Sequence, residues 1–460
     1  MTPEATHRRP RVVIIGAGFA GTHAAQALAK LPVDVTVVDR SNHFTFQPLL
    51  YQVGMAVLSP AEIASPIRTI LRHNANTEVL MDEAVRFDLD RRRVCLRSGA
   101  EISYDYLMLA TGATHSYFGH DQWEPLAPGL KTIEDAIEIR RRVLLAFELA
   151  EREMLETGSH PPLNFVVIGG GPTGVELAGA ICDITRRYML HDFRHIEPAK
   201  SRVILIEGEK YVLASYPQEL SIKAEEQLKA LGAEVHTGLR VTDVQPGLVI
   251  AGDQRFPAAV TLWAAGVQAS PLGKMLGTAT DKRGCVVVNA TLNPEGHPEI
   301  FVCGDLAHVE ENGRHIPGVA QPAMQMGDHV ARMIEADLNH QPRKPFHYFD
   351  KGDMATIGRL AAVAKVEWPF KARWSGFIAW IAWLVVHIYF LIGFRNRLAV
   401  LSQWVWSYFT FTSGVRLIYG SQSLPGWTDK NGVEKNPVPH PLDPSAPGTN
   451  LESPKSAAAD

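Results

Sequence analysis

The sequence has few cysteines, little net charge and no hydrophobic segment at its N-terminus. Its four cysteines, Cys95, Cys182, Cys285 and Cys303, are far apart in 460 residues, so no CxxC-type pair predicts a local redox disulfide or a zinc site. A net charge of −4 provides no basic surface for nucleic acid, and we expect no such partner. Because strand-like sequence begins at Arg11 without an apolar segment before it, we expect this end of the protein to stay in the cytoplasm.

The composition that is present is typical of a globular protein. Hydrophobic residues make up 46% of the chain and charged residues 20%. A chain of 460 residues is too long for one ordinary domain, and its length predicts roughly two to three packed units.

A βαβ unit is predicted at the start of the chain. Arg11–Ile15 is a short β-branched run typical of a buried strand, and it leads into Gly16-Ala-Gly-Phe-Ala-Gly21. An alanine-rich helix is expected at 22–30, and a second strand at 33–38 ends at Asp39. The unit has the order of a dinucleotide-binding fold.

The same pattern returns later in the chain. Asn164–Ile168 is a predicted strand, Gly169-Gly-Gly-Pro-Thr-Gly174 is the turn, and a helix is expected from Val175. Arg202–Ile206 is then a strand that ends at Glu207. One such glycine pattern alone is weak evidence, but two in strand–turn–helix context strongly predict two bound dinucleotides.

Glycine is required in these turns for three different reasons. The first glycine permits the sharp bend, the second lets the backbone approach a pyrophosphate, and the third lets the helix pack against the strand. The helix N-terminus then offers unpaired N–H groups and a partial positive charge to the phosphates.

The acidic residues indicate which dinucleotide each turn binds. Asp39 lies 18 residues after Gly21, the distance at which an acid meets a ribose hydroxyl. Glu207 lies 33 residues after Gly174, where NADPH would carry its 2′-phosphate. At ~4 Å and an effective dielectric constant of ~20 the repulsion is about 4 kcal/mol, which disfavours NADPH roughly a thousandfold. The second site is therefore predicted to take NADH.

We expect an α/β architecture of two Rossmann-like domains, the second inserted in the first, plus a C-terminal membrane-associating region. Each half that begins with a βαβ unit is expected to end in a strand that runs into a loop, at 107–112 in the first half and at 260–266 in the second. The expected division of the chain is a flexible N-terminus (1–10), the FAD-binding domain (11–160 and 276–341), the NADH-binding domain (161–275), the membrane-associating region (342–420) and a disordered tail (421–460).

Several motifs give the chain a family resemblance. They are Phe46-Gln-Pro-Leu-Leu-Tyr-Gln52, Gly171-Pro-Thr-Gly-Val-Glu176, Gly304-Asp305, Ala320-Gln-Pro-Ala-Met-Gln325 and Tyr348-Phe-Asp-Lys-Gly352. With these motifs, the chain resembles the type II NADH dehydrogenases from about Arg11 to Ile418. These are single-subunit NADH:quinone oxidoreductases that move electrons without pumping protons. The Ala-Gln-x-x-x-Gln element is the most specific motif, and Pro322 inside it is a mild departure.

The resemblance implies non-covalent FAD and a role for each matching residue. Gly16, Gly18, Gly21, Asp39 and Asp305 would hold FAD, and Gly169, Gly171, Gly174 and Glu207 would hold NADH. Glu176 would lie near the nicotinamide and the flavin, either relaying a proton or polarising the pocket, while Gln321, Gln325 and Lys351 would face the flavin from the quinone side. The further cofactor contacts expected are Phe19, Ala20, Arg40, Gln47, Thr111, Gly112, Pro172, Thr173, Gly266 and Gln321.

The quinone substrate, menaquinone or ubiquinone, implies contact with the cytoplasmic face of the cell membrane. Residues 377–394 are 18 residues without a charge if His387 is neutral, which is borderline for a spanning helix of about 20 residues. Basic residues flank both ends, and 398–412 is amphipathic with interfacial aromatics. A peripheral or monotopic helix is favoured over a spanning helix, and over a buried helix or homodimer contact.

Other enzymes of the same fold remain alternatives. A disulfide reductase needs a cysteine pair beside the flavin, which is absent locally, but Cys182, Cys285 and Cys303 could still converge as in a sulfide:quinone reductase. A ferredoxin-type reductase would not need the apolar C-terminal region. A flavin-bound redox sensor, or an interaction protein like the apoptosis factors, would keep both glycine turns yet oxidise NADH slowly.

Overall fold

The structure, a computed structural model, describes residues 8–159, 162–410 and 415–418. The expected flexible N-terminus is therefore described only from residue 8, and the expected tail at 421–460 lies outside the described residues. The same holds for residues 411 and 412 of the expected amphipathic segment.

A five-stranded parallel sheet forms around the first predicted βαβ unit. The β-branched side chains of β1 (Arg11–Ile15) are almost all buried, and β1 pairs with β2 (Asp34–Asp39) on one side and β9 (Tyr106–Leu109) on the other. The full order is β20-β9-β1-β2-β5, with β20 at Ile300–Val302 and β5 at Thr77–Met81. Helices α1 (Phe19–Leu28) and α8 (Ala320–Leu338) pack against each other on this sheet.

A four-stranded parallel sheet forms around the second unit. Its order is β13-β12-β11-β17, and β11 (Asn164–Ile168) is buried along its whole length. The other strands are β12 (Arg202–Ile206), β13 (Ala233–His236) and β17 (Val260–Trp263), and the helices around them are α5 (Ile133–Thr157), α6 (Pro172–Asp183) and α7 (Gln218–Ala230). With two parallel sheets flanked by helices, the predicted α/β fold class is confirmed.

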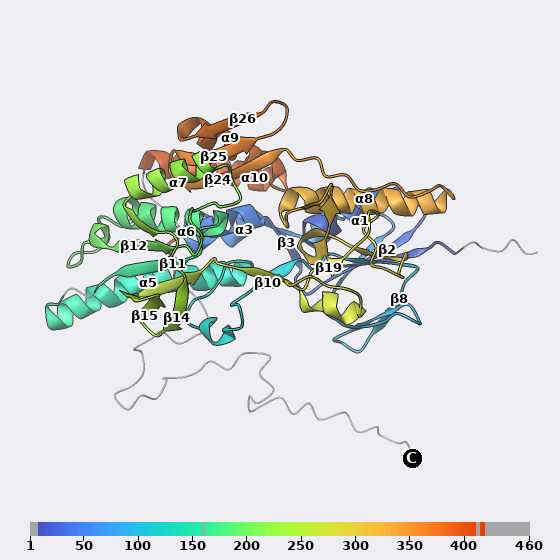
Figure 1. Cartoon of the computed structure of the whole chain (residues 1–460), viewed down its shortest axis with the longest axis horizontal. Helices are drawn as coiled ribbons and strands as arrows, with labels where there is room; N and C mark the ends of the chain where they lie inside the picture. The colour runs from blue at the N-terminus through green and yellow to red at the C-terminus, as the bar shows by residue number, and fades with distance from the viewer. Residues whose placement is uncertain (1–7, 160–161, 411–414, 419–460) are drawn as a thin grey trace, which may run out of the picture.

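The two sheets occupy separate halves of the molecule and meet near β10 (Figure 1). There β10 (Ala113–His115) follows β9, β18 (Val267–Ala269) follows β17, and the two short strands pair antiparallel. The chain leaves the first sheet after β9 and returns to it with β20. The smaller sheets are β6 (Ala84–Asp88) with β7 (Arg93–Leu96) and β8 (Glu101–Ser103), β14 (Val241–Gln245) with β15 (Leu248–Ala251) and β16 (Gln254–Pro257), β3 (His43–Thr45) with β4 (Ala64–Pro66), β19 (Val286–Val287) with β21 (Ala307–His308), and β22 (Glu310–Glu311) with β23 (Arg314–His315).

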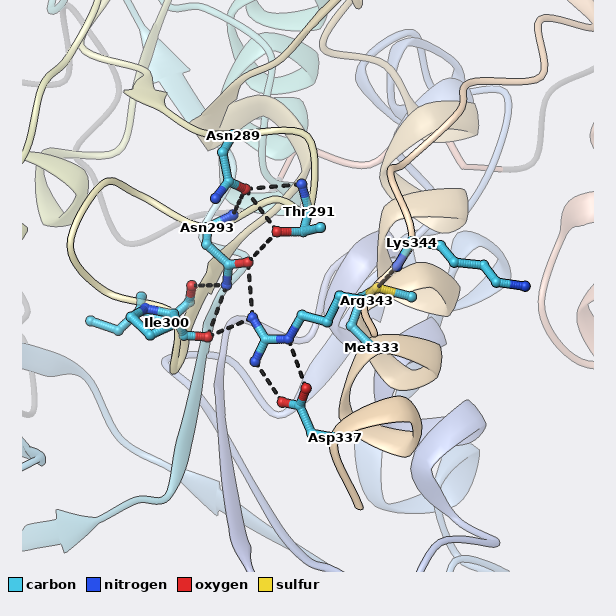
Figure 2. Close-up of polar contacts among 9 residues, drawn as sticks. Asn289, Thr291, Asn293, Ile300, Met333, Asp337, Arg343 and Lys344 are labelled. Atoms are coloured by element: carbon cyan, nitrogen blue, oxygen red, sulfur yellow. Dashed lines mark hydrogen bonds and ion pairs between the residues drawn. The ribbon is translucent and has the colours of Figure 1, made fainter. Parts of the chain in front are cut away.

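The side chain of Arg343 links the segment after α8 to the first sheet through hydrogen bonds (Figure 2). Its guanidinium donates to both carboxylate oxygens of Asp337, at 3.0 and 2.6 Å, and to Asn293 Oδ1 at 3.0 Å. Asn293 in turn donates to the carbonyl of Ile300 on β20 at 2.6 Å. This network joins the end of α8, the last strand of the first sheet and the start of the C-terminal region.

The C-terminal region is a small sheet covered by two helices. Strands β24 (Gly352–Gly358), β25 (Ala361–Val366) and β26 (Ala372–Ser375) are antiparallel, and α9 (Phe377–Phe390) and α10 (Phe394–Thr410) follow them. The region lies over α6 and α7, beside the second sheet (Figure 1). The largest hydrophobic cluster runs continuously from the second sheet into it and includes Trp383, Val400 and Trp404.

The apolar run expected at 377–394 is divided between two helices. Helix α9 ends at Phe390, Leu391 is extended, and Gly393 has a φ of +90° before α10 begins at Phe394. Among the helices of the described residues, none combines the length and the apolar character needed to cross a membrane.

Candidate active site

The first glycine turn closes at the carboxyl ends of β1 and β9. Gly16 has a φ of +98°, and a Cβ there would lie 2.5 Å from the carbonyl oxygen of Ala110. A Cβ at Gly21 would lie 1.9 Å from Gly16 O, because α1 crosses directly over the turn. From the end of β2, Asp39 accepts hydrogen bonds from Ala17 N at 2.6 Å and Ser41 N at 2.7 Å.

The second turn repeats this geometry. Gly169 has a φ of +105°, a Cβ on it would lie 2.5 Å from Ala264 C, and a Cβ at Gly174 would lie 1.8 Å from Gly169 O. Glu207 follows β12 and accepts from Gly170 N and, at 2.7 Å, from Glu209 N. Each acid therefore binds the backbone of its own glycine turn.

The middle glycine of each turn leaves room for a phosphate. A Cβ on Gly18 or Gly171 would meet no heavy atom within 4 Å, whereas a Cβ on any other glycine of the two turns would meet one. These two glycines are the N-caps of α1 and α6, and neither helix N-terminus is capped by a side chain. Open space above an uncapped helix N-terminus fits the pyrophosphate of a dinucleotide, so both turns fit the predicted cofactors, FAD and NADH.

The remaining expected cofactor residues lie on the same elements. Phe19 packs edge-on against Phe44 and Phe46, at ring-centre distances of 5.1 and 5.9 Å. The others lie in the first turns of α1 and α6 (Ala20, Pro172, Thr173), directly after β2 (Arg40), at the start of the short 3-10 helix η1, Gln47–Leu49 (Gln47), between β9 and β10 (Thr111, Gly112) and between β17 and β18 (Gly266).

Asp305 closes the first site from the side of α8. It lies in η6 (Gly304–Leu306), where a Cβ on Gly304 would touch the Cβ atoms of Ala20 and Ala323 at 3.8 and 3.5 Å. Its carboxylate lies 3.6 Å from Lys131 Nζ, and burial raises the pKa of Asp305. The start of α1, the start of α8 and this acid therefore converge.

Two buried polar atoms near this convergence have no hydrogen-bond partner among the described residues. They are the hydroxyl of Thr111 and Oε1 of Gln321. A buried polar atom without a partner costs about 1–3 kcal/mol. Both atoms are therefore suited to contact a bound group, and their position supports FAD in the first site.

Gln321 binds the first residue of β24, and Gln325 binds the segment before it. Gln321 donates from Nε2 to Gly352 O at 2.9 Å and keeps its acceptor oxygen unpaired. Gln325 donates to Phe349 O at 3.0 Å and accepts from Phe349 N at 2.9 Å. Lys351 lies in the sequence between Phe349 and Gly352, and its ammonium is 5.6 Å from the ring centre of Phe390 on α9.

Glu176 is half-buried where α6 meets β24. Its carboxylate accepts a hydrogen bond from Thr356 N, and burial raises the pKa of Glu176 to about 8. Loss of hydration is the cause of the rise in pKa, and among the described residues no cation contributes to lowering it. At neutral pH the side chain therefore carries a proton.

The sequence analysis did not single out an aromatic cavity beside Glu176. Gln52 donates to the Tyr51 hydroxyl at 2.7 Å and accepts from Trp404 Nε1 at 2.7 Å, so it ties the Phe46–Gln52 motif to α10. Trp383 of α9 also lines the cavity and stacks on His387, with ring centres 4.0 Å apart. The Phe46–Gln52 motif could have indicated that Tyr51 and Gln52 belong to the site. No feature of the sequence indicates that they contact Trp383 or Trp404.

All four cysteines are buried and none forms a disulfide. Burial raises the pKa of Cys182 to about 12 and that of Cys285 to about 11, and it also raises the pKa of Cys303. A thiol must ionise to act as a nucleophile. These residues are therefore poorly suited to sulfide or disulfide chemistry.

Comparison with known proteins identifies the family of the chain. The pyridine nucleotide-disulphide oxidoreductase family model matches residues 10–327. The chain is 43% identical over 419 residues to the type II NADH:quinone oxidoreductase NdhA of Mycobacterium tuberculosis, covering 87% of this chain and 88% of that protein. It is 41% identical over 432 residues to Ndh of the same organism, covering 91% and 92%.

Solved structures show the same fold at lower identity. NDH2 from Plasmodium falciparum, in complex with NADH, superposes with a TM-score of 0.78 over 90% of this chain and 100% of that chain, at 19% identity. The sulfide:quinone oxidoreductase of Aquifex aeolicus gives a TM-score of 0.65 over 87% and 95%, also at 19% identity. The chain belongs to the pyridine nucleotide-disulphide oxidoreductase family and, within it, to the type II NADH:quinone oxidoreductases.

Proposed function

We propose that the chain oxidises NADH at the second glycine turn and reduces a membrane quinone beside FAD held at the first. FAD supplies the acceptor for hydride and the store for two electrons. The protein binds and orients both dinucleotides through the turns at Gly16–Gly21 and Gly169–Gly174. The observation that carries this proposal is the matched pair of turns, each with an uncapped helix and an acid bound to it.

We assign the domains as expected from the sequence. The FAD-binding domain is 11–160 and 276–341, and the NADH-binding domain, 161–275, lies between its two parts. The return of β20 to the sheet of β1 supports this division. The C-terminal region, 342–420, covers the side of α6 on which Glu176 lies.

Glu176 is the proposed proton donor of the reaction. Conversion of NADH and quinone to NAD⁺ and quinol consumes one proton besides the hydride. Because burial raises the pKa of Glu176 to about 8, this carboxyl is protonated at neutral pH and can donate. The bond from Thr356 N orients it.

The two glutamines have different proposed roles. Gln321 has a free acceptor oxygen and is the residue of the pair that contacts a bound group directly. Gln325 uses both ends of its amide on the backbone of Phe349, so it positions the segment that carries Lys351. The ammonium of Lys351 lies near Phe390, the last residue of α9, and we propose that its charge faces the quinone side of the flavin.

We propose that α9 and α10 lie on the membrane surface. Apolar side chains recur on the outer face of each helix with 41–81% exposure, at helical spacing: Ile378, Ile381, Val385 and Tyr389 on α9, and Phe394, Leu398, Leu401 and Val405 on α10. Such an exposed apolar surface marks an interaction site. Basic residues at both ends, Lys371, Arg373, Arg395 and Arg397, suit an interfacial helix at the cytoplasmic face.

The function is tested by turnover of the purified holoenzyme. Oxidation of NADH should depend on an added short-chain quinone and produce one quinol per NADH. The alternative sulfide:quinone activity predicts quinone reduction by sulfide instead of NADH. The surface of α9 and α10 is tested by flotation with liposomes, and a homodimer that buries this face instead would appear as dimeric protein that does not float.

A further inference from the structure

A small cavity extends along one face of α6, away from the glycine turn. Its lining includes Glu176, Ala180 and Asp183, which are four and three residues apart and therefore lie on one side of the helix. Its volume is about 60 Å³. By the usual measure of about 15 Å³ per water centre this is room for roughly four waters.

The two acids of the cavity are held in place by the close approach of α6 to β24. A Cβ at Gly179 would lie 1.5 Å from Ile357 O, so only glycine fits between the two carboxylates. On either side, Glu176 accepts from Thr356 N and Asp183 accepts from Arg359 N at 2.9 Å. The two acids are thus fixed at opposite ends of the same contact.

Two buried polar atoms in the walls make no hydrogen bond to the described residues, although one of them, Oδ1 of Asp183, has an ion pair with Arg187. Nε1 of Trp383, a side chain only 1% exposed, and Oδ1 of Asp183 make no hydrogen bond within the described part of the chain. Buried polar atoms around a cavity of this size are the usual partners of ordered water. The cavity is therefore suited to a short chain of waters.

Asp183 lies at the other end of the cavity from Glu176, and a partly exposed cation lies beside it. Its Oδ1 is 3.4 Å from Nε of Arg187, whose side chain is 35% exposed. The other charged or titratable groups facing it are Arg359, from the turn after β24, and Tyr188, whose hydroxyl bonds to Ser407 of α10. Glu176 at the inner end faces Tyr216 and has no cation beside it.

We propose that this cavity carries protons from solvent to Glu176, with Asp183 as the entry group. The proposal rests on the function proposed above. Each turnover takes two hydrogens into the quinol, one as hydride from NADH and one as a proton. When Glu176 gives up its proton, the waters of the cavity pass a replacement from Asp183, which regains its own from solvent. No electron moves along this path, and the protein returns to its starting state.

Asp183→Asn is the first test, because the amide keeps the shape of the side chain but cannot carry the proton. Stopped-flow reduction of the flavin by NADH should be unchanged, since hydride transfer takes no proton from solvent. Reoxidation of the reduced holoenzyme by a short-chain quinone should slow by about tenfold or more. Its solvent deuterium isotope effect should rise, and small weak acids such as formic acid should restore part of the rate.

Ala180→Val tests the path without altering either carboxyl. The larger side chain occupies space that water needs and should produce the same slow, isotope-sensitive reoxidation. Cys182→Ala is the matched control, because Cys182 is buried on α6 but does not line the cavity. It should change the melting temperature and leave the isotope effect at the wild-type value.

Asp183→Glu distinguishes the loss of a proton-carrying group from a structural effect of the substitution. This variant keeps a titratable group, so its rate of reoxidation by quinone should be within about threefold of the wild-type rate. Wild-type rates and isotope effects in both Asp183→Asn and Ala180→Val would overturn the proposal, and so would equal slowing by Asn and Glu without an isotope effect. If wild-type reduced enzyme is not reoxidised by quinone at all, the proposed function fails instead.

Discussion

Asp39 and Glu207 each follow the second strand of a βαβ unit and accept hydrogen bonds from the backbone of the neighbouring glycine turn. The acid positions were predictable because strand, turn and helix follow one another locally in the sequence. The partners of the glutamines were not, because Gln325 binds Phe349, 24 residues away, through backbone atoms that have no sequence signature.

Glu207→Gln should narrow the preference for NADH over NADPH. The amide can still accept from Gly170 N, but the negative charge near the 2′-phosphate is lost. The loss removes a repulsion of about 4 kcal/mol, so the ratio of kcat/KM for the two donors should fall by up to roughly a thousandfold. Asp39→Asn is the control at the other turn and should leave the ratio unchanged. An unchanged ratio in Glu207→Gln would place this acid away from the ribose.

Gln321→Leu should slow quinone reduction more than Gln325→Leu does. Removing the unpaired acceptor of Gln321 loses a contact with the bound group, at a cost of about 1–3 kcal/mol in the reoxidation step. Flavin reduction by NADH should scarcely change. Gln325→Leu should instead lower the melting temperature, because it frees the backbone of Phe349. Slower reduction by NADH in Gln321→Leu, with normal reoxidation, would show that the quinone site lies elsewhere.

At the scale of elements, the C-terminal helices have two different faces. Trp383, Val400 and Trp404 join the core of the second sheet, while the opposite faces are exposed and apolar. The sequence predicted an apolar surface helix but not its break at 391–393, because an uninterrupted apolar run contains no capping signal apart from Gly393. The cavity was unpredictable because Gln52 and Trp404 are 352 residues apart.

The double variant Val385→Glu and Leu398→Glu should release the protein from liposomes. Both side chains are more than half exposed, so the new charges are hydrated in the free protein but would have to leave water on binding lipid. Leu155→Glu, at 60% exposure on α5, is the control and should float normally. NADH oxidation with a soluble quinone should stay near wild type in both. Flotation of the double variant at the wild-type level would exclude this face as the membrane surface.

Arg343→Met should destabilise the junction between α8 and the C-terminal region. Asp337 would be left without its cation, and Asn293 Oδ1 would keep only the Thr291 hydroxyl as a donor, so the expected loss is about 2 kcal/mol of unfolding free energy. Arg332→Met, at an exposed position of α8, should cost less than about 0.5 kcal/mol. Urea titration of both holoenzymes compares the two losses, and equal losses would show that the Arg343 network adds no stability.

At the scale of the whole molecule, two sheets of the same type present their glycine turns to different ligands, and a third layer covers the helix that follows the second turn. The β-branched strands and glycine turns made this duplication predictable. The C-terminal region was predicted only as a membrane contact. Its packing on α6 through β24 could not be predicted, because a contact between residues far apart in the sequence produces no periodic pattern.

The most direct test of the account is a two-step stopped-flow measurement on the purified holoenzyme under anaerobic conditions. NADH alone should bleach one equivalent of flavin absorbance per chain, and a short-chain quinone added to the reduced enzyme should restore it with formation of one quinol. Acid precipitation afterwards should release the flavin into solution as free FAD, because its binding is non-covalent. If NADH bleaches the flavin but quinone does not restore it, this protein is not an NADH:quinone oxidoreductase.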